Sequence, residues 1–146
     1  MELSSPAYTY GSSIPATYTC SGRGVSPPLA IHGVPDNAQS LALLVHDPDA
    51  PSGDFIHWTV WNILPDTADI DEGTAPAGAA EGSNDFGKTG YGAPCPPSGT
   101  HRYFFELYAL DTAPVLESGA PLSDIAPLLE KHTLAKATLM GTVSAA

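Results

Sequence analysis

Four stretches of the chain have the residue pattern of β-strands. They are rich in β-branched or aromatic residues, and apolar and polar residues partly alternate along them. The predicted strands run from Ser40 to His46, from His57 to Ile63, from His101 to Leu110 and from Lys136 to Val143. Prolines and Asx residues between them, as in residues 48–53, favour turns. Strands separated by turns indicate a β-sandwich.

Only one stretch has the periodicity of an amphipathic helix. Four residues fall at positions i, i+3, i+4 and i+7, on one helical face: Ile125, Leu128, Leu129 and His132. We expect Asp124 to cap this helix. Pro127 would then occupy the third helical position, where a missing amide donor is harmless.

The remainder of the chain has little periodicity. Residues 70–99 are rich in Gly, Ala, Pro and Ser, which predicts a long connection that is either functional or mobile and is a candidate pocket wall. No repeat and no change in composition marks a boundary within the 146 residues. We therefore expect a single all-β domain over residues 1–146, with one or two short peripheral helices.

Composition and charge narrow the possible partners. Hydrophobic residues make up 42% of the chain and charged residues 14%, which is typical of a globular protein. The net charge of −11 would repel nucleic acid and anionic bilayers at long range. The longest apolar run, Leu41 to Val45, is only five residues, and no signal peptide is recognisable. We expect a cytoplasmic protein that neither binds nucleic acid nor inserts into a membrane.

The two cysteines, Cys20 and Cys95, are too few for a disulfide framework and lack the spacing of a zinc site. In the reducing compartment expected here, the simpler interpretation is two unpaired thiols.

Candidate chemistry begins with Asp47 and Asp49, two carboxylates at the end of an apolar strand. Each of them could simply cap its own turn through backbone amides two residues further on. His57 begins the next predicted strand after a short turn. A hairpin-like return of the chain would place its imidazole against Asp47 or Asp49, and this contact would fix the tautomer of the ring.

His101 and Tyr103 project together from the start of the third predicted strand, since alternate residues share a face. The same face continues with apolar residues, which favours a pocket at the end of a sandwich. The alternative is two satisfied polar residues at a strand end. Two imidazoles, a phenol and a carboxylate suit either a receptor for phosphate or carboxylate groups, or an acid–base catalyst. The sequence contains no short-range pair of ligands typical of a metal site, such as two histidines one helical turn apart, so we do not expect a metal site.

Five strings along nearly the whole chain resemble the phosphatidylethanolamine-binding protein family, specifically its bacterial and archaeal branch. They are Ile14-Pro15 with Tyr18-Thr19-Cys20 and Ser26 to Leu29, then Asp47 to Pro51, His57-Trp58, Asp85 to Gly92, and Pro96 to Tyr103. The resemblance implies a Greek-key sandwich of two antiparallel sheets. It also implies a small pocket at one end for phosphate, phosphorylethanolamine, acetate or similar anions, with no cofactor.

The resemblance assigns a ligand-binding role to residues in three of these strings and to Cys95, which directly precedes the last string. They are Asp47, Asp49, Pro51, His57, Cys95, Pro96, Pro97, His101 and Tyr103. Within this set we expect Asp49 to orient His57. Cys95 replaces a glycine whose backbone amide helps to hold the anion in the family. Its side chain would be either an exposed, oxidisable thiol on the rim or a buried, inert one.

These features favour a protein that binds a small anion, such as phosphate, a carboxylate or a phosphorylated metabolite. Two alternatives stay open: a small lyase, cyclase or hydrolase that uses the same Asp and His residues, and an interaction protein whose pocket senses a ligand. A homodimer is also compatible with the resemblance. Because imidazolium carries charge and donates two hydrogen bonds, anion affinity should fall as pH rises through the titration of the histidines.

Overall fold

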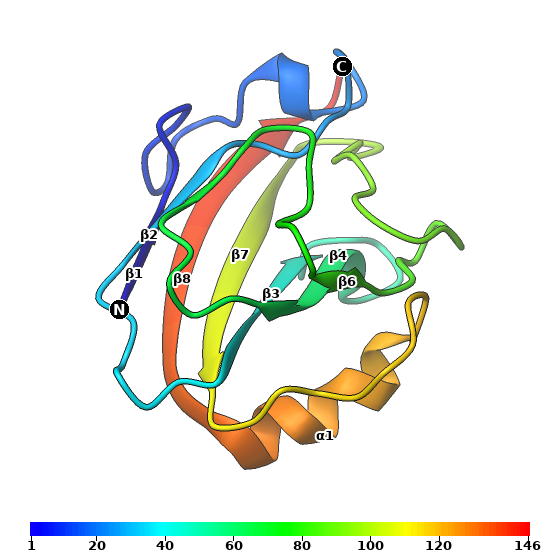
Figure 1. The fold of residues 1–146 in the computed structure, drawn as a ribbon. Coiled ribbons are helices and arrows are strands. Elements are labelled where there is room, and N and C mark those ends of the chain that lie inside the picture. Colours follow the sequence, from blue (N-terminus) through cyan, green and yellow to red (C-terminus); the bar gives the residue numbers. More distant parts are fainter.

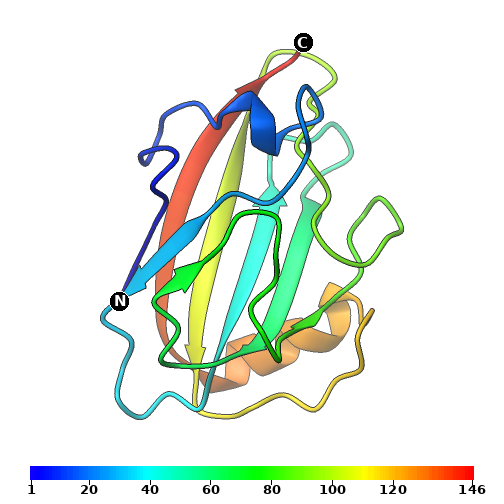
Figure 2. The same ribbon diagram turned by 45° about the horizontal axis from the view of Figure 1, so that its top comes forward.

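The computed structural model describes residues 1–146 and contains two antiparallel β-sheets and one α-helix (Figures 1 and 2). The smaller sheet has the order β1-β2-β5, formed by Glu2–Ser4, Leu29–His32 and Asp69–Ile70. The larger sheet has the order β6-β4-β3-β7-β8, formed by Ala80–Glu81, Phe55–Ile63, Ser40–Asp47, Thr100–Leu110 and Thr133–Ser144. The helix α1 spans Leu122–His132, and Ala16–Tyr18 form the 3-10 turn η1.

The expectation of two antiparallel sheets is confirmed, and the Greek-key order remains a prediction. The four strands predicted from the sequence correspond to β3, β4, β7 and β8. The short strands β1, β2, β5 and β6 were missed, because two to four residues carry too little alternation to be recognised. Residues 70–99 are largely irregular, as expected, apart from the end of β5 and the two residues of β6.

The main hydrophobic core contains side chains from both sheets. Leu29 and Ile31 of β2 belong to the same buried cluster as Val45 of β3 and Phe105 and Leu107 of β7. Both views show β1 and β2 lying over the strongly curved larger sheet (Figures 1 and 2). The two sheets thus remove one another's apolar faces from water, which is the dominant favourable contribution to folding.

Strand β7 shows how alternation separates the core from the surface. Its inward face runs from His101 through Tyr103, Phe105 and Leu107 to Ala109, all buried as predicted. The residues that alternate with them are exposed or half-buried, namely Arg102, Phe104, Glu106 and Tyr108. The apolar part of the inward face fixes the strand in the core, so the two polar residues at its beginning are held rigidly at the end of the sheet.

Helix α1 lies across one end of the larger sheet, and Ile125 and Leu129 bury its apolar face as predicted (Figure 1). The expected cap was wrong. The helix begins at Leu122 after Pro121, and Asp124 lies inside the first turn without making a side-chain cap. Pro127 is therefore the sixth helical residue, where it removes one backbone hydrogen bond. Asp124 still lies where the positive end of the helix dipole favours a carboxylate.

Cys20 and Cys95 form a disulfide, with Cα atoms 5.4 Å apart, so the prediction of two free thiols was wrong. A sequence separation of 75 concealed the proximity of the two cysteines. The backbone explains it, since the Cys20 amide donates a hydrogen bond to the carbonyl of Pro94 at 3.0 Å and joins the two loops beside the sulfurs.

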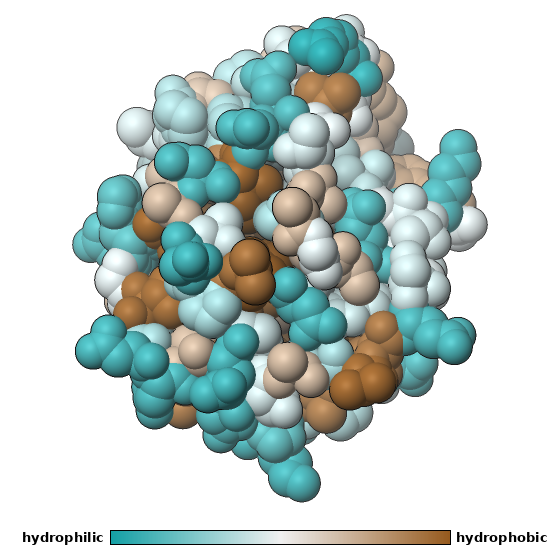
Figure 3. Space-filling view, in the orientation of Figure 1, coloured by the Kyte–Doolittle hydropathy of each residue, from teal (hydrophilic) through white to brown (hydrophobic).

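The face seen in Figure 3 is mostly polar, and its apolar residues form separate patches rather than one continuous surface. Helix α1 is neither long enough nor apolar enough to span a bilayer.

Candidate functional site

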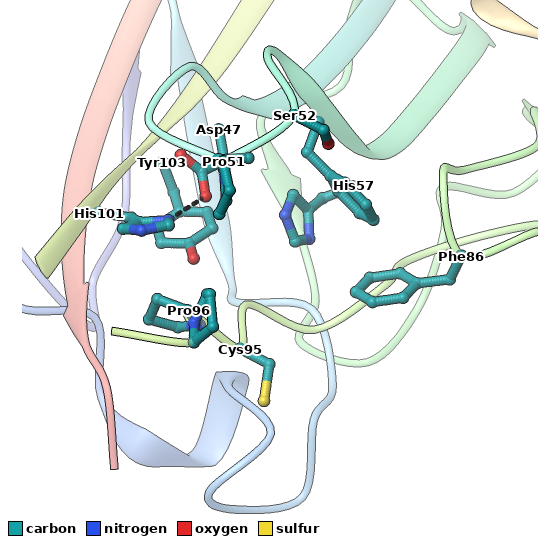
Figure 4. A pocket seen from close by; sticks show the side chains of 12 residues that line it. Asp47, Pro51, Ser52, His57, Phe86, Cys95, Pro96, His101 and Tyr103 are labelled. Carbon is teal, nitrogen blue, oxygen red and sulfur yellow. Dashed lines mark hydrogen bonds and ion pairs between the residues drawn. The ribbon is translucent and has the colours of Figure 1, made fainter. Parts of the chain in front are cut away.

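A cavity of about 220 Å³ opens at the end of the larger sheet opposite to α1. Twelve residues line it: Asp47, Ala50, Pro51, Ser52, Phe55, His57, Phe86, Cys95, Pro96, Pro97, His101 and Tyr103. Figure 4 shows the side chains of Asp47, His101, Tyr103, His57 and Phe86 around this space. Eight of the nine residues that the resemblance assigned to the ligand are present in the lining, and Asp49 is not.

Strand order brings the polar residues of the cavity together. Strand β3 pairs with β4 on one side and with β7 on the other, and both pairs are antiparallel. The end of β3 at Asp47 therefore lies beside the beginning of β4, which carries His57, and the beginning of β7, which carries His101 and Tyr103. Residues that are far apart in the sequence thus converge at one sheet end.

Asp47 and His101 form a buried pair. The distance from His101 Nδ1 to Asp47 Oδ2 is 2.7 Å, and the two side chains are 10% and 4% exposed. Because an ionised carboxylate only accepts hydrogen bonds, Nδ1 carries a proton and Nε2 is the ring nitrogen left for a ligand. Asp47 also accepts the amide of Asp49 through Oδ1 at 2.8 Å. Asp47 therefore caps its own turn, which was one of the alternatives, and also orients a histidine, but this is His101 and not the expected His57.

His57 is oriented by a backbone carbonyl. Its Nδ1 donates a hydrogen bond to the Gly92 carbonyl at 2.7 Å, and the Gly92 amide donates to the His57 carbonyl, also at 2.7 Å. The prediction that Asp47 or Asp49 orients His57 was wrong, because the Gly92 carbonyl holds Nδ1 while Asp47 binds His101 and Asp49 binds Arg102. At position 92 a Cβ would lie 2.4 Å from the Phe86 ring, so a larger residue than glycine would displace that ring.

The protonation of His57 follows from its surroundings. Burial lowers the pKa of His57 below its usual value, although the hydrogen bond to the Gly92 carbonyl raises it. The imidazole is therefore neutral at pH 7. With Nδ1 protonated, its Nε2 is a hydrogen-bond acceptor until a ligand or a lower pH brings a second proton.

Tyr103 supplies a neutral hydroxyl donor. Burial raises the pKa of Tyr103 well above its usual value, so the phenol keeps its proton. Its ring contacts His57 edge to face with centroids 5.2 Å apart and stacks with His101 at 6.5 Å. Figure 4 shows its hydroxyl projecting between the two histidines, on the side of Pro96.

Asp49 pairs with Arg102 outside the cavity. Arg102 Nε and Nη2 donate to Oδ2 and Oδ1 of Asp49 at 2.9 and 2.8 Å, and the Arg102 amide donates to Oδ2 at 2.9 Å. These contacts lower the pKa of Asp49 to about 2. The pair connects the β3–β4 loop, which carries Pro51, to the outer face of β7. Alternation could have predicted that Arg102 faces away from His101, although not that its partner is Asp49.

Cys95 lines the cavity as half of a disulfide, so the reactive rim thiol considered above does not exist. Cys95 is exposed, while the next residue, Pro96, is buried beneath the cavity. The disulfide thereby connects the segment that carries Pro96 and Pro97 to the loop after η1.

Four lining residues were missed: Ala50, Ser52, Phe55 and Phe86. Phe55 could have been found, because it stands two positions before His57 on the same strand face. Phe86 had no such signal. It lies in an irregular loop that Asn84 organises, accepting hydrogen bonds from the Phe86 and Lys88 amides and donating one to the Gly90 carbonyl.

The acidic, histidine and cysteine side chains offer no group of three or more that is arranged to hold a metal ion. What the cavity does present is a set of hydrogen-bonding groups at one end, namely two imidazole Nε2 atoms and a phenol. Proline and phenylalanine side chains surround these groups. Such a set binds small polar groups and can also transfer protons.

A family model described as Phosphatidylethanolamine-binding protein matches residues 4–144. The chain belongs to this family, as its sequence strings indicated. The match extends across both sheets and includes every residue that lines the cavity.

Related proteins align with this chain over almost its whole length. A protein of Methanothermobacter thermautotrophicus named UPF0098 protein is 49% identical, over 97% of both chains. The crystal structure of a phosphatidylethanolamine-binding protein homologue from Chlamydia trachomatis has a TM-score of 0.95 and 41% identity, over 99% of this chain and 97% of that one. The Escherichia coli protein YbcL, described as a new member of the mammalian family, has a TM-score of 0.92 and 30% identity, over 99% and 98%.

Proposed function

We propose that this protein binds a small anion in the cavity of about 220 Å³, at one end of a Greek-key sandwich. One observation carries the proposal: His57, His101 and Tyr103 line one cavity, and both imidazoles are held from behind through Nδ1. Fixed Nδ1 partners leave both Nε2 atoms for a ligand. Rings that are already oriented lose little entropy on binding, which favours affinity.

The anion would be held by hydrogen bonds from the Tyr103 hydroxyl and from protonated imidazole. Because His57 is neutral at pH 7 when the cavity is empty, an anion would bind together with a proton that converts its Nε2 into a donor. Affinity should therefore increase as pH falls, which agrees in direction with the expectation from sequence.

A thermal-shift titration with phosphate, phosphorylethanolamine and acetate tests this proposal. We expect each anion to raise the melting temperature of the wild type and to have a much smaller effect on His101→Ala. His32→Ala is the matched control, since His32 is an exposed histidine on β2. If none of the three anions stabilises the wild type at tens of millimolar, or if His101→Ala responds like the wild type, the proposal is wrong.

A second candidate is an enzyme that transfers a proton, and the buried Asp47–His101 pair favours it. A carboxylate behind an imidazole fixes the tautomer and orientation of the ring, which a general base requires. Turnover of a metabolite that is lost in both Asp47→Asn and His101→Ala would support the enzyme. Binding without turnover across a broad metabolite set would support the binding protein alone.

A further inference from the structure

We propose that the cavity selects an aryl acid, meaning an aromatic ring attached to a single carboxylate, and that Phe86 is the residue that selects the ring. This inference rests on the proposed function, since it names the class of anion bound there. It follows from the size of the cavity, from the rings in its wall and from the charges that the wall lacks.

Acetate or phosphate alone would leave much of the cavity unfilled. An apolar protein cavity of about 150 Å³ holds one benzene molecule. The cavity here measures about 220 Å³, so it has room for a ring of that size and for a small acidic group. A ligand that fills it would carry its acid to the end where His57, His101 and Tyr103 lie, and its apolar part to the opposite end.

The wall opposite the Asp47–His101 pair is aromatic. The Phe86 ring contacts Phe55 edge to face with centroids 4.8 Å apart and contacts His57 at 5.5 Å, while Phe55 and His57 are 4.9 Å apart. Phe86 lines the cavity, and 48% of its surface is still exposed to solvent. Figure 4 places it on the far side of His57 from the Asp47–His101 pair.

Such a half-covered ring favours an aromatic partner. Aromatic pairs in offset or edge-to-face arrangements gain free energy beyond the area that they bury. A ligand ring beside Phe86 would extend the existing cluster of three rings by one member and would cover surface that water now reaches. An alkyl group of equal volume would gain only the burial.

The charges of the wall favour a single negative charge on the ligand. Neither lysine nor arginine lines the cavity, and its one carboxylate, Asp47, is bound to His101. Arg102, although adjacent to His101 in the sequence, is bound to Asp49 on the outer face. A dianion such as a fully ionised phosphate ester would find no fixed positive charge to offset its desolvation. A carboxylate needs only one proton or a few hydrogen-bond donors.

Isothermal titration calorimetry at pH 7.5 with benzoate, cyclohexanecarboxylate, acetate and phenyl phosphate tests this inference. We expect benzoate to bind best, with cyclohexanecarboxylate weaker by about fivefold because it lacks the aromatic contact. Acetate should bind more weakly than both. Phenyl phosphate, mostly a dianion at this pH, should bind more weakly than benzoate.

Phe86→Leu removes the ring while keeping an apolar side chain, and we expect it to abolish the preference of benzoate over cyclohexanecarboxylate without changing acetate binding. Phe104→Leu is the matched control, because Phe104 lies on the outer face of β7, stacked with His46. It should leave all four affinities unchanged.

The two proposals fail differently in these experiments. Cyclohexanecarboxylate binding as tightly as benzoate, or benzoate binding no better than acetate, would overturn the aryl preference while anion binding stands. Tighter binding of phenyl phosphate than of benzoate would overturn the single charge. An unchanged benzoate preference in Phe86→Leu would overturn the role of Phe86. If none of the four ligands binds, and phosphate and phosphorylethanolamine also fail in the thermal-shift titration, the proposed function itself is wrong.

Discussion

His101 and Arg102 are neighbours at the beginning of β7, yet they belong to two different sites. Each binds one carboxylate of the same Asp-Pro-Asp turn: His101 binds Asp47 inside the cavity, and Arg102 binds Asp49 outside it. The first pair is almost inaccessible to water, whereas the side chains of the second pair are 51% and 29% exposed. Strand alternation alone assigns one basic residue to candidate chemistry and the other to holding a loop.

The difference in burial makes the two pairs respond differently to change. Removal of one partner from a buried pair leaves a polar group without water or a partner, which costs considerable free energy. Exposed ion pairs contribute little, because water and salt screen them. The outer pair gains from geometry instead, since a planar guanidinium that binds a carboxylate through two nitrogens specifies the position of the β3–β4 loop.

The largest effect should come from breaking the covalent link on the cavity side, by replacing both Cys20 and Cys95 with serine. The disulfide joins residues with a sequence separation of 75, for which chain-entropy arguments give a loss of about 4 kcal/mol in the free energy of unfolding. Urea denaturation of the variant and of the wild type, with and without reductant, measures it. A wild type whose midpoint is the same under both conditions would show that the link adds nothing to stability.

Asp47→Ala and Asp49→Ala test directly whether the inner and outer pairs contribute differently to stability. Asp47→Ala leaves His101 Nδ1 and the Asp49 amide without their acceptor, so we expect a loss of about 3 kcal/mol. Asp49→Ala should cause a much smaller loss, which shrinks further as salt is added. Denaturant unfolding at low and high salt measures both. Equal losses from the two substitutions would contradict the distinction between an inner and an outer pair.

His57, on the cavity side, should make the stability of the protein depend on pH. Because burial lowers its pKa in the folded state, the unfolded chain takes up a proton more readily. Stability should therefore decrease as pH falls below about 6.5, the usual histidine pKa. His57→Gln should show a shallower decrease in melting temperature over this range. The same slope in both proteins would assign the acid sensitivity to other groups.

The smallest effect belongs to the outer pair. Asp49 has a pKa of about 2 in the folded protein, below its value in the unfolded chain. Its contribution to stability is therefore fully present above about pH 4 and is lost as pH falls towards 2. The melting temperatures of the wild type and Asp49→Asn should differ most above pH 4 and converge below it. A difference that stays constant down to pH 2 would be inconsistent with this assignment.

Periodicity in the long strands made much of the fold predictable. The inward face of β7, with His101 and Tyr103 at its beginning, could be read from alternation alone, and it places two ligand-binding candidates correctly. Contacts that depend on loops could not be read in this way. The partner of His57 is a carbonyl in an irregular loop, and the partner of Cys20 is 75 residues away, so neither leaves a local signal.

Asp49 shows a different limit of sequence reasoning. The Asp-Pro-Asp string lies at the end of β3, as the sequence indicated. The string does not specify which of its two carboxylates faces inward, because the turn after β3 interrupts the strand alternation. Knowledge of the adjacent strand was needed, since Arg102 lies on the outer face and draws Asp49 to it. The family strings identified the residues of the site better than they identified the contacts between them.

The lack of lysine and arginine around the cavity also has a kinetic consequence. A protein with a net charge of −11 presents an approaching anion with a field of the same sign, and no cationic rim counteracts it. Added salt shortens the range of that field, so the association rate constant of an anionic ligand should rise with ionic strength. Anion receptors with basic rims show the opposite trend. An anionic ligand would therefore associate with this protein fastest in a saline medium.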